Sequence, residues 1–592
     1  MSAHVVALLV FGAVALPAAF GSFGKSSPGG SSRPGRHGIS GRPGAPGAVG
    51  TNGGLLRSLV RPPGGPAPRE GARWARHADL RALACAGLPR DRLVLGHEVG
   101  RALRQQVLAA EPAQSLAIVG PTQSGKTTGL AVPAILGWSG PVLAASVKTD
   151  LVRDTLEWRR RCGTVWCFDP AGTTGLPRSE WSPVTSARTW ALARRAAADL
   201  TDVARGEGAG ADAEFWYATA AKLLAPLLFA AATGGRTIHD VVRWVDTQET
   251  DEVLEILHAS GVPEALQAAR ATWLRDERQR SAVYTTAETV IEPFAEPGMA
   301  EVLGGSCDTP PYGTPVMASE RVRWSAAGSA GLGGTGLGGE GHRSAGLGRA
   351  IDPDALLLGC NTLYLCAPAH DQHRLRAVFA ALVAQVVHAA FAASSRAGRP
   401  LDPPMLVVLD EAANIAPLKE LDGFAATCAG HGVQLVTVWQ DLAQVRARYG
   451  ERAATVVNNH RAKLFLPGIA DPGTLDFASN LAGDQELATP SVTLGARGQR
   501  TVTTSPQVRR LLPPDTLRRL PRGRAVLLYG ALPPALVRLR PWFSDPVLAR
   551  RAGIGRPEGP HVALGGRGGR GRRPRHRWSG RWKGGAALQS RV

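Results

Sequence analysis

Gly120-Pro-Thr-Gln-Ser-Gly-Lys-Thr127 is the stretch of sequence that decides the fold. It matches the pattern G-x-x-x-x-G-K-[ST], in which backbone N–H groups surround phosphates. SLAIVG (115–120) before it is typical of a buried strand, and KTTGLAVPAIL (126–136) after it is typical of an apolar helix. An ordinary Gly-rich turn is the alternative. The strand and helix around the loop instead favour a P-loop nucleotide hydrolase that binds ATP, or a close relative, with Mg²⁺.

The motif assigns a role to each part of the loop. Lys126 is expected to reach the outer phosphates, and the Thr127 hydroxyl is expected to ligate Mg²⁺ at the start of a helix whose dipole favours an anion. The complete set of predicted nucleotide contacts is Gly120, Pro121, Thr122, Gln123, Ser124, Gly125, Lys126, Thr127 and Thr128.

A second motif supplies the acidic partners. PMLVVLDE (404–411) is a buried apolar strand that ends in two carboxylates. We expect Asp410 to hold Mg²⁺ through water and Glu411 to orient and polarise the attacking water. Gln440 ends the next apolar strand, VQLVTVWQ (433–440), and is a candidate sensor of the γ-phosphate or the water. A turn or helix-capping role is the alternative for Gln440.

Apolar runs that alternate with helical patterns predict an α/β fold with a largely parallel sheet. The runs show no strict alternation, as expected for strands covered on both faces. The strand candidates are 115–119, 142–147, 165–168, 362–366, 406–409, 434–438, 462–466 and 525–529. A helical pattern between them predicts an inserted all-α domain over 185–303, followed by a Gly-rich low-complexity stretch over 304–350. The nucleotide-binding domain then comprises residues 73–184 and 351–548.

The ends of the chain differ from this body. Val5–Phe23 is uncharged and just long enough to cross a bilayer, and basic residues follow it. A membrane anchor over 1–23 with the body in the cytoplasm is the favoured interpretation, and a cleaved signal peptide is the alternative. Residues 24–72 have the composition of a Gly/Pro/Arg-rich linker, and residues 549–592 that of a basic, disordered tail.

The composition of the chain excludes few classes of binding partner. The 592 residues carry a net charge of +20, much of it at the two ends. A basic tail binds nucleic acid or anionic lipid through phosphates, or is only a solvated segment. Seven cysteines without a CxxC pair predict reduced thiols and no zinc site. Trp216 and Tyr217 are expected to fill the helical core, with stacking on bases as the alternative. His431 and His460 receive no role.

Several strings resemble the TraG/TraD-type coupling proteins of type IV secretion and conjugative DNA transfer, in an actinobacterial-like form. They are SVKTDL (146–151), FDP (168–170), WSP (181–183), LDEAANI (409–415) and WQDLAQ (439–444), and the resemblance runs from roughly residue 71 to 548. It implies a membrane-anchored, homohexameric ATPase with a RecA-like nucleotide domain and an inserted all-α domain. It also implies an inner-membrane location and a single-stranded, relaxase-bound DNA cargo. The implied partners are the relaxase and the proteins of a type IV secretion channel.

The chain departs from the family pattern in two respects. Members commonly have two transmembrane helices, whereas one apolar segment is found here. Ring ATPases also supply an arginine in trans, for which Arg446 and Arg461 are candidates that spacing alone does not separate. An FtsK-like or protein-secretion motor and a nucleotide-switched membrane adaptor are the alternative functions. The order of the motifs favours the coupling protein.

Overall fold

A computed structural model describes residues 71–553 except 88, 90, 100–105, 206–210, 296–298, 300–301, 304–346, 369–371, 416–417, 419 and 495–499. The predicted anchor, most of the linker, most of the basic tail and most of the Gly-rich stretch lie outside the described residues. The predicted start of the disordered tail at residue 549 is wrong, because a helix (Pro546–Arg551) continues through this position. Gly71 begins the described body, and Leu347–Ala350 resume the chain after the Gly-rich stretch.

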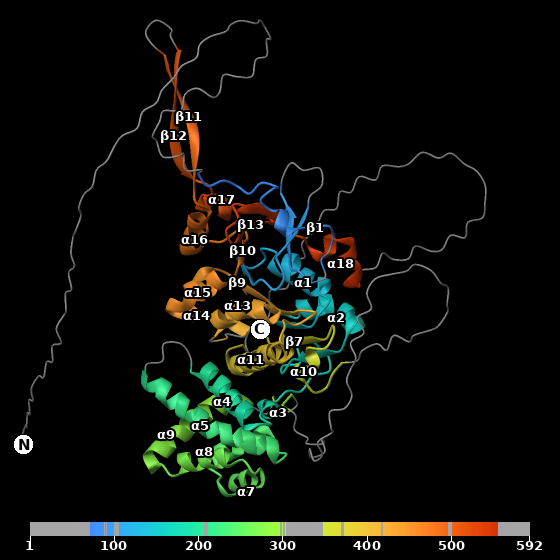
Figure 1. Ribbon diagram of the computed structural model, residues 1–592, viewed down its shortest axis with the longest axis vertical. Helices are drawn as coiled ribbons and strands as arrows, with labels where there is room; N and C mark the ends of the chain where they lie inside the picture. The colour runs from blue at the N-terminus through green and yellow to red at the C-terminus, as the bar shows by residue number, and fades with distance from the viewer. Residues whose placement is uncertain are drawn as a thin grey trace, which may run out of the picture. The chain divides into compact units, whose positions relative to one another are not determined.

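The body is built on one mixed sheet of twelve strands (Figure 1). Seven neighbouring strands are parallel, and five antiparallel strands extend one side. In sheet order the strands are β1 (Ala84–Cys85), β3 (Val107–Ala109), β2 (Val94–Glu98), β14 (Ala535–Arg538), β13 (Arg524–Tyr529), β10 (Ala462–Phe465), β4 (Leu116–Val119), β9 (Val433–Trp439), β8 (Met405–Leu409), β5 (Val142–Ser146), β7 (Thr362–Cys366) and β6 (Val165–Phe168).

Helices cover both faces of the parallel strands, so alternate strand residues enter two separate cores. On β8, Leu406 and Val408 join the core beneath α1 (Val132–Gly137), α2 (Asp150–Cys162) and α18 (Pro546–Arg551). Val407 and Leu409 join the other core, beneath α11 (Gln372–Ala397), α13 (Leu421–Thr427), α14 (Leu442–Tyr449), α15 (Ala453–Asn459) and α16 (Pro472–Ala482). This double coverage explains the continuous apolar runs of the central strands.

All eight predicted strands are present, with ends displaced by at most one residue. The expectation of a largely parallel sheet is incomplete, because the run at 524–529 is antiparallel to β10. The short strands β1, β2, β3 and β14 and the long hairpin of β11 (Asp484–Leu494) and β12 (Arg500–Arg510) were not predicted. Three of them have only two to four residues, and β11 and β12 carry two prolines that argue against a strand in the sequence alone.

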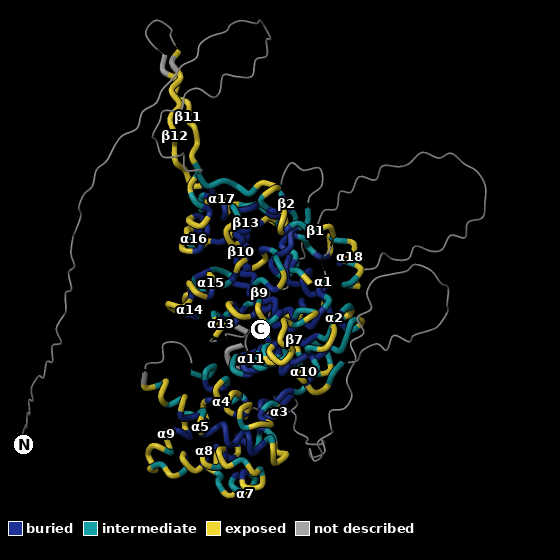
Figure 2. The backbone as a smooth tube through the Cα atoms, viewed as in Figure 1, coloured by how far each residue is buried: buried dark blue, intermediate teal, exposed yellow. Residues whose placement is uncertain are grey.

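The insertion between β6 and β7 is helical, as predicted. It contains α3 (Pro183–Ser186), α4 (Trp190–Ala204), α5 (Ala211–Thr233), α6 (Ile238–Asp246), α7 (Asp251–Ala259), α8 (Pro263–Trp273) and α9 (Glu277–Ile291). The central helix α5 contacts all the others of this set, and its residues Leu223, Leu224, Leu227 and Leu228 are fully buried (Figure 2). The Ser182, Thr189, Thr237 and Asp276 side chains cap four of the helices.

Two helices of the described part, α5 and α11, are long and apolar enough to cross a membrane by composition, and 61% of each apolar window is buried inside the body. Both are central packing helices of their layers, α5 within the insertion and α11 against the sheet and α4. Their apolar character is therefore explained by the core.

Arg159 in α2 is a fully buried cation whose partners are neutral oxygens. It donates to the Thr362 hydroxyl (2.6 Å) and to the carbonyls of Trp138, Gly140, Cys360 and Asn361 (2.8–3.3 Å). Burial lowers the pKa of the guanidinium. One side chain thus satisfies carbonyls at the starts of β5 and β7 and ties α2 to both strands.

Replacement of Arg159 by alanine should lower the free energy of unfolding by about 3 kcal/mol, because several buried carbonyls lose their donor. Urea unfolding followed by circular dichroism measures the change. The control is Arg161→Ala on the same helix, since Arg161 is exposed and pairs only with Glu157 within the helix; its change should stay below about 0.5 kcal/mol. Equal losses in the two variants would contradict the assigned role of Arg159.

Candidate nucleotide site

The phosphate loop connects β4 to the first turn of a helix. Gly120 continues β4 by donating its N–H to Trp439 O (3.1 Å), and the helical turn begins at Thr127. A Cβ at Gly120 would lie 2.8 Å from Leu466 Cβ and 2.9 Å from Ser124 Oγ, so only glycine fits there. Gly125 has φ +94° and Gln123 has φ +61°, both in the left-handed region. These conformations give the loop the tight curvature that a phosphate cradle needs.

Lys126 is buried, and its ammonium group folds back over the loop. It donates to the carbonyls of Gly120 and Pro121, the latter at 2.7 Å. Burial lowers the pKa of Lys126, and the nearby Asp410 and Glu411 carboxylates oppose this shift. The cation is thus held inside the loop, where incoming phosphate oxygens would replace the carbonyls as its acceptors.

Asp410 lies directly at the end of β8 and contacts the phosphate loop. Thr127 Oγ1 donates to Asp410 Oδ2 at 3.3 Å, and Ser146 Oγ at the end of β5 donates to the same oxygen at 3.3 Å. The structure therefore brings Thr127 and Asp410 together, 283 residues apart in sequence, as the two motifs predict.

Burial and crowding by Asp150 and Glu411 raise the pKa of Asp410 to about 6, although the Thr127 hydroxyl and Lys126 act in the opposite direction. Carboxylates that repel one another as anions, beside neutral hydroxyl oxygens, are a suitable environment for Mg²⁺. Thr127 and Asp410 fit the predicted metal contacts in type and in position.

Glu411 and Gln440 also lie at this edge of the sheet. Glu411 has φ +64°, an unfavourable conformation for a side chain other than glycine, directly after β8. Gln440 is half-buried directly after β9, the strand between β4 and β8, and its N–H donates to Gln444 Oε1 at 2.9 Å. Both residues therefore lie beside the phosphate loop, although no structural observation tests their chemical roles.

The end of β5 and the start of α2 add residues to the site that the motif analysis left without a role. Ser146 and Asp150 affect Asp410 directly, and the exposed Lys148 lies near enough to lower the pKa of Lys126. All three belong to the string SVKTDL (146–151), which carried only a family resemblance in the sequence. The sequence did contain a signal for these roles, namely the position of the string. It begins at the end of a buried parallel strand, and that end must lie at the same edge of the sheet as the phosphate loop.

Other singled-out residues have structural roles. Asp169 in FDP accepts bonds from Thr173 and Thr174 within its own turn, and Ser182 in WSP caps α3. His460 is buried between Thr437 Oγ1 and Val456 O, and burial lowers its pKa to about 4. His431 stacks on Phe391.

The two candidate trans arginines occupy different edges of the sheet. Arg446 pairs with Asp471 at 3.3 Å, beyond the carboxyl end of β10. Arg461 immediately precedes β10, at the amino edge, where it pairs with Glu111 at 3.1 Å and lies over the Tyr529 ring. Arg461 therefore lies at the edge opposite the phosphate loop of its own chain.

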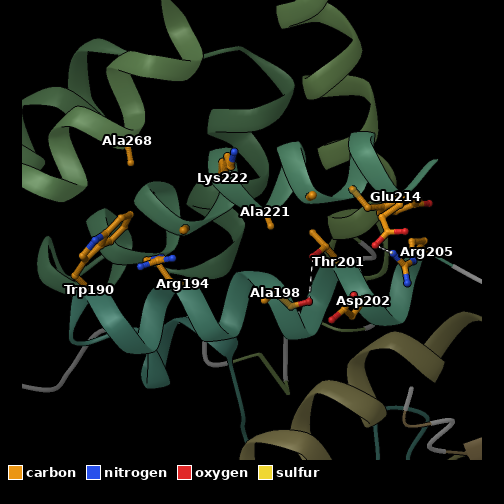
Figure 3. Close-up of a pocket in the computed structure, with 13 residues that line it drawn as sticks. Trp190, Arg194, Ala198, Thr201, Asp202, Arg205, Glu214, Ala221, Lys222 and Ala268 are labelled. Atoms are coloured by element: carbon orange, nitrogen blue, oxygen red, sulfur yellow. Dashed lines mark hydrogen bonds and ion pairs between the residues drawn. The ribbon is translucent and has the colours of Figure 1, made fainter. Parts of the chain in front are cut away.

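Away from the phosphate site, a hollow of about 400 Å³ lies between α4 and α5 in the inserted domain (Figure 3). Trp190, Arg194 and Lys222 lie at one part of it, and Arg205 pairs with Glu214 (3.6 Å) at the other. Tyr217 lines this hollow, whereas Trp216 packs edge-on against Phe215. No residue of the phosphate site takes part in it.

Comparison with known proteins supports the resemblance read from the motifs. Residues 73–307 match a family described as "Type IV secretory system Conjugative DNA transfer", and residues 404–522 match one described as "TraM recognition site of TraD and TraG". The chain belongs to the TraG/TraD-type coupling proteins. Two Escherichia coli proteins named "Conjugal transfer protein TraG" are 24% and 23% identical to it over 548 residues, which cover 82% of this chain and 78% of each relative.

Solved coupling proteins share the fold. The bacterial conjugative coupling protein TrwB in complex with sulphate aligns with a TM-score of 0.54 over 81% of this chain and 96% of that chain. TrwB in complex with the ATP analogue ADPNP aligns with a TM-score of 0.53 over the same shares. Both are 17% identical to this coupling protein, and the likeness confirms the α/β fold with its helical insertion.

Replacement of Asp410 by asparagine should stabilise the metal-free protein at pH 8. Because the pKa of Asp410 is about 6 in the folded state, above the ordinary value of 3.8 for an aspartate in an unfolded chain, the folded state binds more protons between these values. The free energy of unfolding therefore falls as pH rises through this window, and the full cost, about 3 kcal/mol, is present above it. Denaturation in EDTA at pH 5 and pH 8 should show a larger gain for Asp410→Asn at pH 8.

The control for this test is Asp246→Asn at the exposed end of α6. The change in the free energy of unfolding that this variant causes should be the same at pH 5 and at pH 8. A gain for Asp410→Asn that is the same at pH 5 and pH 8 would contradict a raised pKa for this carboxyl group.

Proposed function

We propose that this chain is a membrane-anchored, Mg²⁺-dependent ATPase that delivers a DNA substrate to a type IV secretion channel during conjugative transfer. The observation that carries the enzymatic part is the bond from Thr127 to Asp410, which joins the phosphate loop to the acidic motif. The family match and the TraG relatives carry the biological part. The relative TrwB was solved with an ATP analogue, which supports ATP as the nucleotide.

The residues of the site can perform this reaction in the following way. The backbone N–H groups of Gly120–Thr127 and the Lys126 ammonium would hold the phosphates, and Thr127 and Asp410 would hold Mg²⁺. A bound metal would neutralise part of the negative charge of the phosphates. Glu411 would accept a hydrogen bond from the attacking water, and its strained conformation would fix that orientation. Gln440, directly after β9, would contact the γ-phosphate or the attacking water.

The same proposal includes the cell biology implied by the family. The body would lie in the cytoplasm at the inner membrane, held by residues 1–23, and six copies would form a ring. The cargo would be single-stranded DNA attached to a relaxase, passed to the channel proteins. The family match favours this reading over an FtsK-like or protein-secretion motor. A nucleotide-switched adaptor is distinguished from it by turnover.

DNA should stimulate ATP hydrolysis by the full-length protein in detergent or lipid. Stimulation should decrease steeply as salt rises, because contacts to phosphates release counterions. Phosphate release is measured with and without single- and double-stranded DNA between 50 and 200 mM salt, a range of about fourfold over which such contacts weaken strongly. Lys126→Ala should reduce turnover by roughly 10²-fold or more. Hydrolysis that ignores DNA would contradict a DNA-transfer motor.

Glu411→Gln should separate binding from turnover. The variant keeps the size of the side chain but cannot accept a proton or polarise water as a carboxylate does, so turnover should fall by about 10²-fold or more. Binding of a fluorescent ATP analogue should stay within about threefold, since the phosphate contacts remain. Glu420→Gln, an exposed acidic residue before α13, is the matched control and should change neither quantity. Unchanged hydrolysis in Glu411→Gln would remove this residue from the mechanism.

A further inference from the structure

Lys148 follows β5 at the edge of the sheet that carries the phosphate loop. Ser146, the last residue of β5, donates through its hydroxyl to Asp410 Oδ2 (3.3 Å), and Lys148 N donates to Ser146 Oγ (3.2 Å). The helix α2 follows, and Thr149 O accepts from Arg153 N (2.8 Å) in its first turn. The backbone of Lys148 is therefore held on both sides, and one of its two supports is bonded directly to Asp410, the expected metal contact.

The side chain of Lys148 is exposed, in contrast to the buried side chain of Lys126. No ion pair or side-chain hydrogen bond joins the Lys148 ammonium group to another residue of the described part of the chain. A lysine of this kind is most often a solvated surface residue. What distinguishes Lys148 from such a residue is its position beside the charged groups of the nucleotide site.

The charge of Lys148 acts on the phosphate loop. Burial is the main cause of the lowered pKa of Lys126, and the Lys148 ammonium group lowers this pKa further, against the Asp410 and Glu411 carboxylates. Repulsion between two ammonium groups is appreciable only where they lie near one another. Two neighbouring cations of this kind are both stabilised by an anion that contacts them together. The bound phosphates would be such an anion.

Lys126 and Lys148 approach the site from different strands. The phosphate loop follows β4, whereas Lys148 follows β5, and β9 and β8 lie between these two strands in the sheet. Asp410, at the end of β8, accepts from Thr127 on one side and from Ser146 on the other. The loop would hold the inner phosphates of a nucleotide, and the metal would contact Thr127 and Asp410. The last phosphate would therefore extend from β4 toward β8 and the end of β5.

Phosphoryl transfer places further negative charge in a site that is already rich in carboxylates. In the transition state, charge is spread over the oxygens of the transferred phosphoryl group, and positioned cations stabilise it. Asp150, Asp410 and Glu411 lie close enough to one another for their charges to interact, and each of them repels that charge. An arginine from a neighbouring copy is one source of compensation. Lys148 is a source within the same chain.

We propose that Lys148 is a further catalytic residue, which contacts the γ-phosphate of bound ATP from the side opposite the phosphate loop and stabilises the negative charge that develops there during hydrolysis. Lys148 acts by its charge alone and takes no part in making or breaking bonds. This inference rests on the proposed function, because it requires ATP hydrolysis at this site. A contact of Lys148 with DNA is the competing role.

Turnover is compared in the full-length protein, unaltered and with Lys148→Ala, with and without single-stranded DNA. In both conditions kcat should fall by about 10²-fold, the usual effect of removing one donor from a site of developing charge. KM for ATP should stay within about threefold, because the contact strengthens mainly in the transition state. Lys148→Arg keeps the positive charge and should recover at least about tenfold of the lost kcat.

A complex of ADP with aluminium fluoride, which imitates the transferred phosphoryl group, gives a readout that does not depend on turnover. Lys148→Ala should weaken the binding of this complex by about 10²-fold, because a mimic of the transition state makes the contact that the substrate makes only weakly. Binding of ADP alone should stay within about threefold, since ADP has no γ-phosphate. Isothermal titration calorimetry measures both affinities.

Thr149→Ala is the matched control, because Thr149 is the exposed neighbour of Lys148 and its side chain does not cap α2. It should change neither kcat nor either affinity, and an equal loss in this control would assign the effect to the shape of the turn.

Four other results would overturn the proposal for Lys148 alone. They are an unchanged kcat in Lys148→Ala, an equal loss of affinity for ADP and for its aluminium fluoride complex, a Lys148→Arg variant as slow as Lys148→Ala, and a loss confined to DNA-stimulated turnover. The last of these would assign Lys148 to a DNA contact. Absence of hydrolysis in the unaltered protein would overturn the proposed function as well.

Discussion

A shared edge of parallel strands determines where the chemistry of this protein lies. Because β4, β9, β8 and β5 run in the same direction, the residues that follow each of them must meet. Asp410 N donates to Ala145 O (2.8 Å) and its carboxylate accepts from Thr127 and Ser146, so three strand ends converge on one buried carboxyl group. A shift of one strand by a single residue would turn these side chains to another face. The site therefore depends on the sheet register before it depends on any loop.

The helical insertion does not interrupt the pairing of the parallel strands, because it leaves the sheet at its outermost strand. It departs after β6, the last strand on its side of the sheet, and the chain returns as β7, which pairs with both β5 and β6. Trp181 fixes the departure, since its N–H donates to Val302 O and its ring nitrogen donates to Gln385 on α11. The inserted domain is thus attached to the sheet through α4, α11 and the WSP turn.

Sequence reasoning predicted the parallel strands and the phosphate site because both carry strong local signals. Gly120–Thr127 has a fixed spacing, and long apolar runs are unmistakable when a strand is buried on both faces. It missed the short antiparallel strands β1, β2, β3 and β14, whose few residues give no periodicity. It also missed Arg159, since no pattern in the sequence distinguishes a buried arginine from the exposed Arg161 on the same helix. The roles of Ser146 and Asp150 required knowledge of which strands are neighbours.

The antiparallel part of the sheet also supports the phosphate loop, even though no motif marks it. Leu539, just beyond β14, packs against the loop helix so closely that a Cβ at Gly129 would lie 3.2 Å from its own Cβ. Leu466, just beyond β10, excludes any side chain at Gly120 in the same way. Two residues that each follow a strand from the later part of the sequence therefore enclose the loop. β13 pairs with β10 on one side and with β14 on the other, so the antiparallel pairing of these strands places Leu466 and Leu539 against the loop.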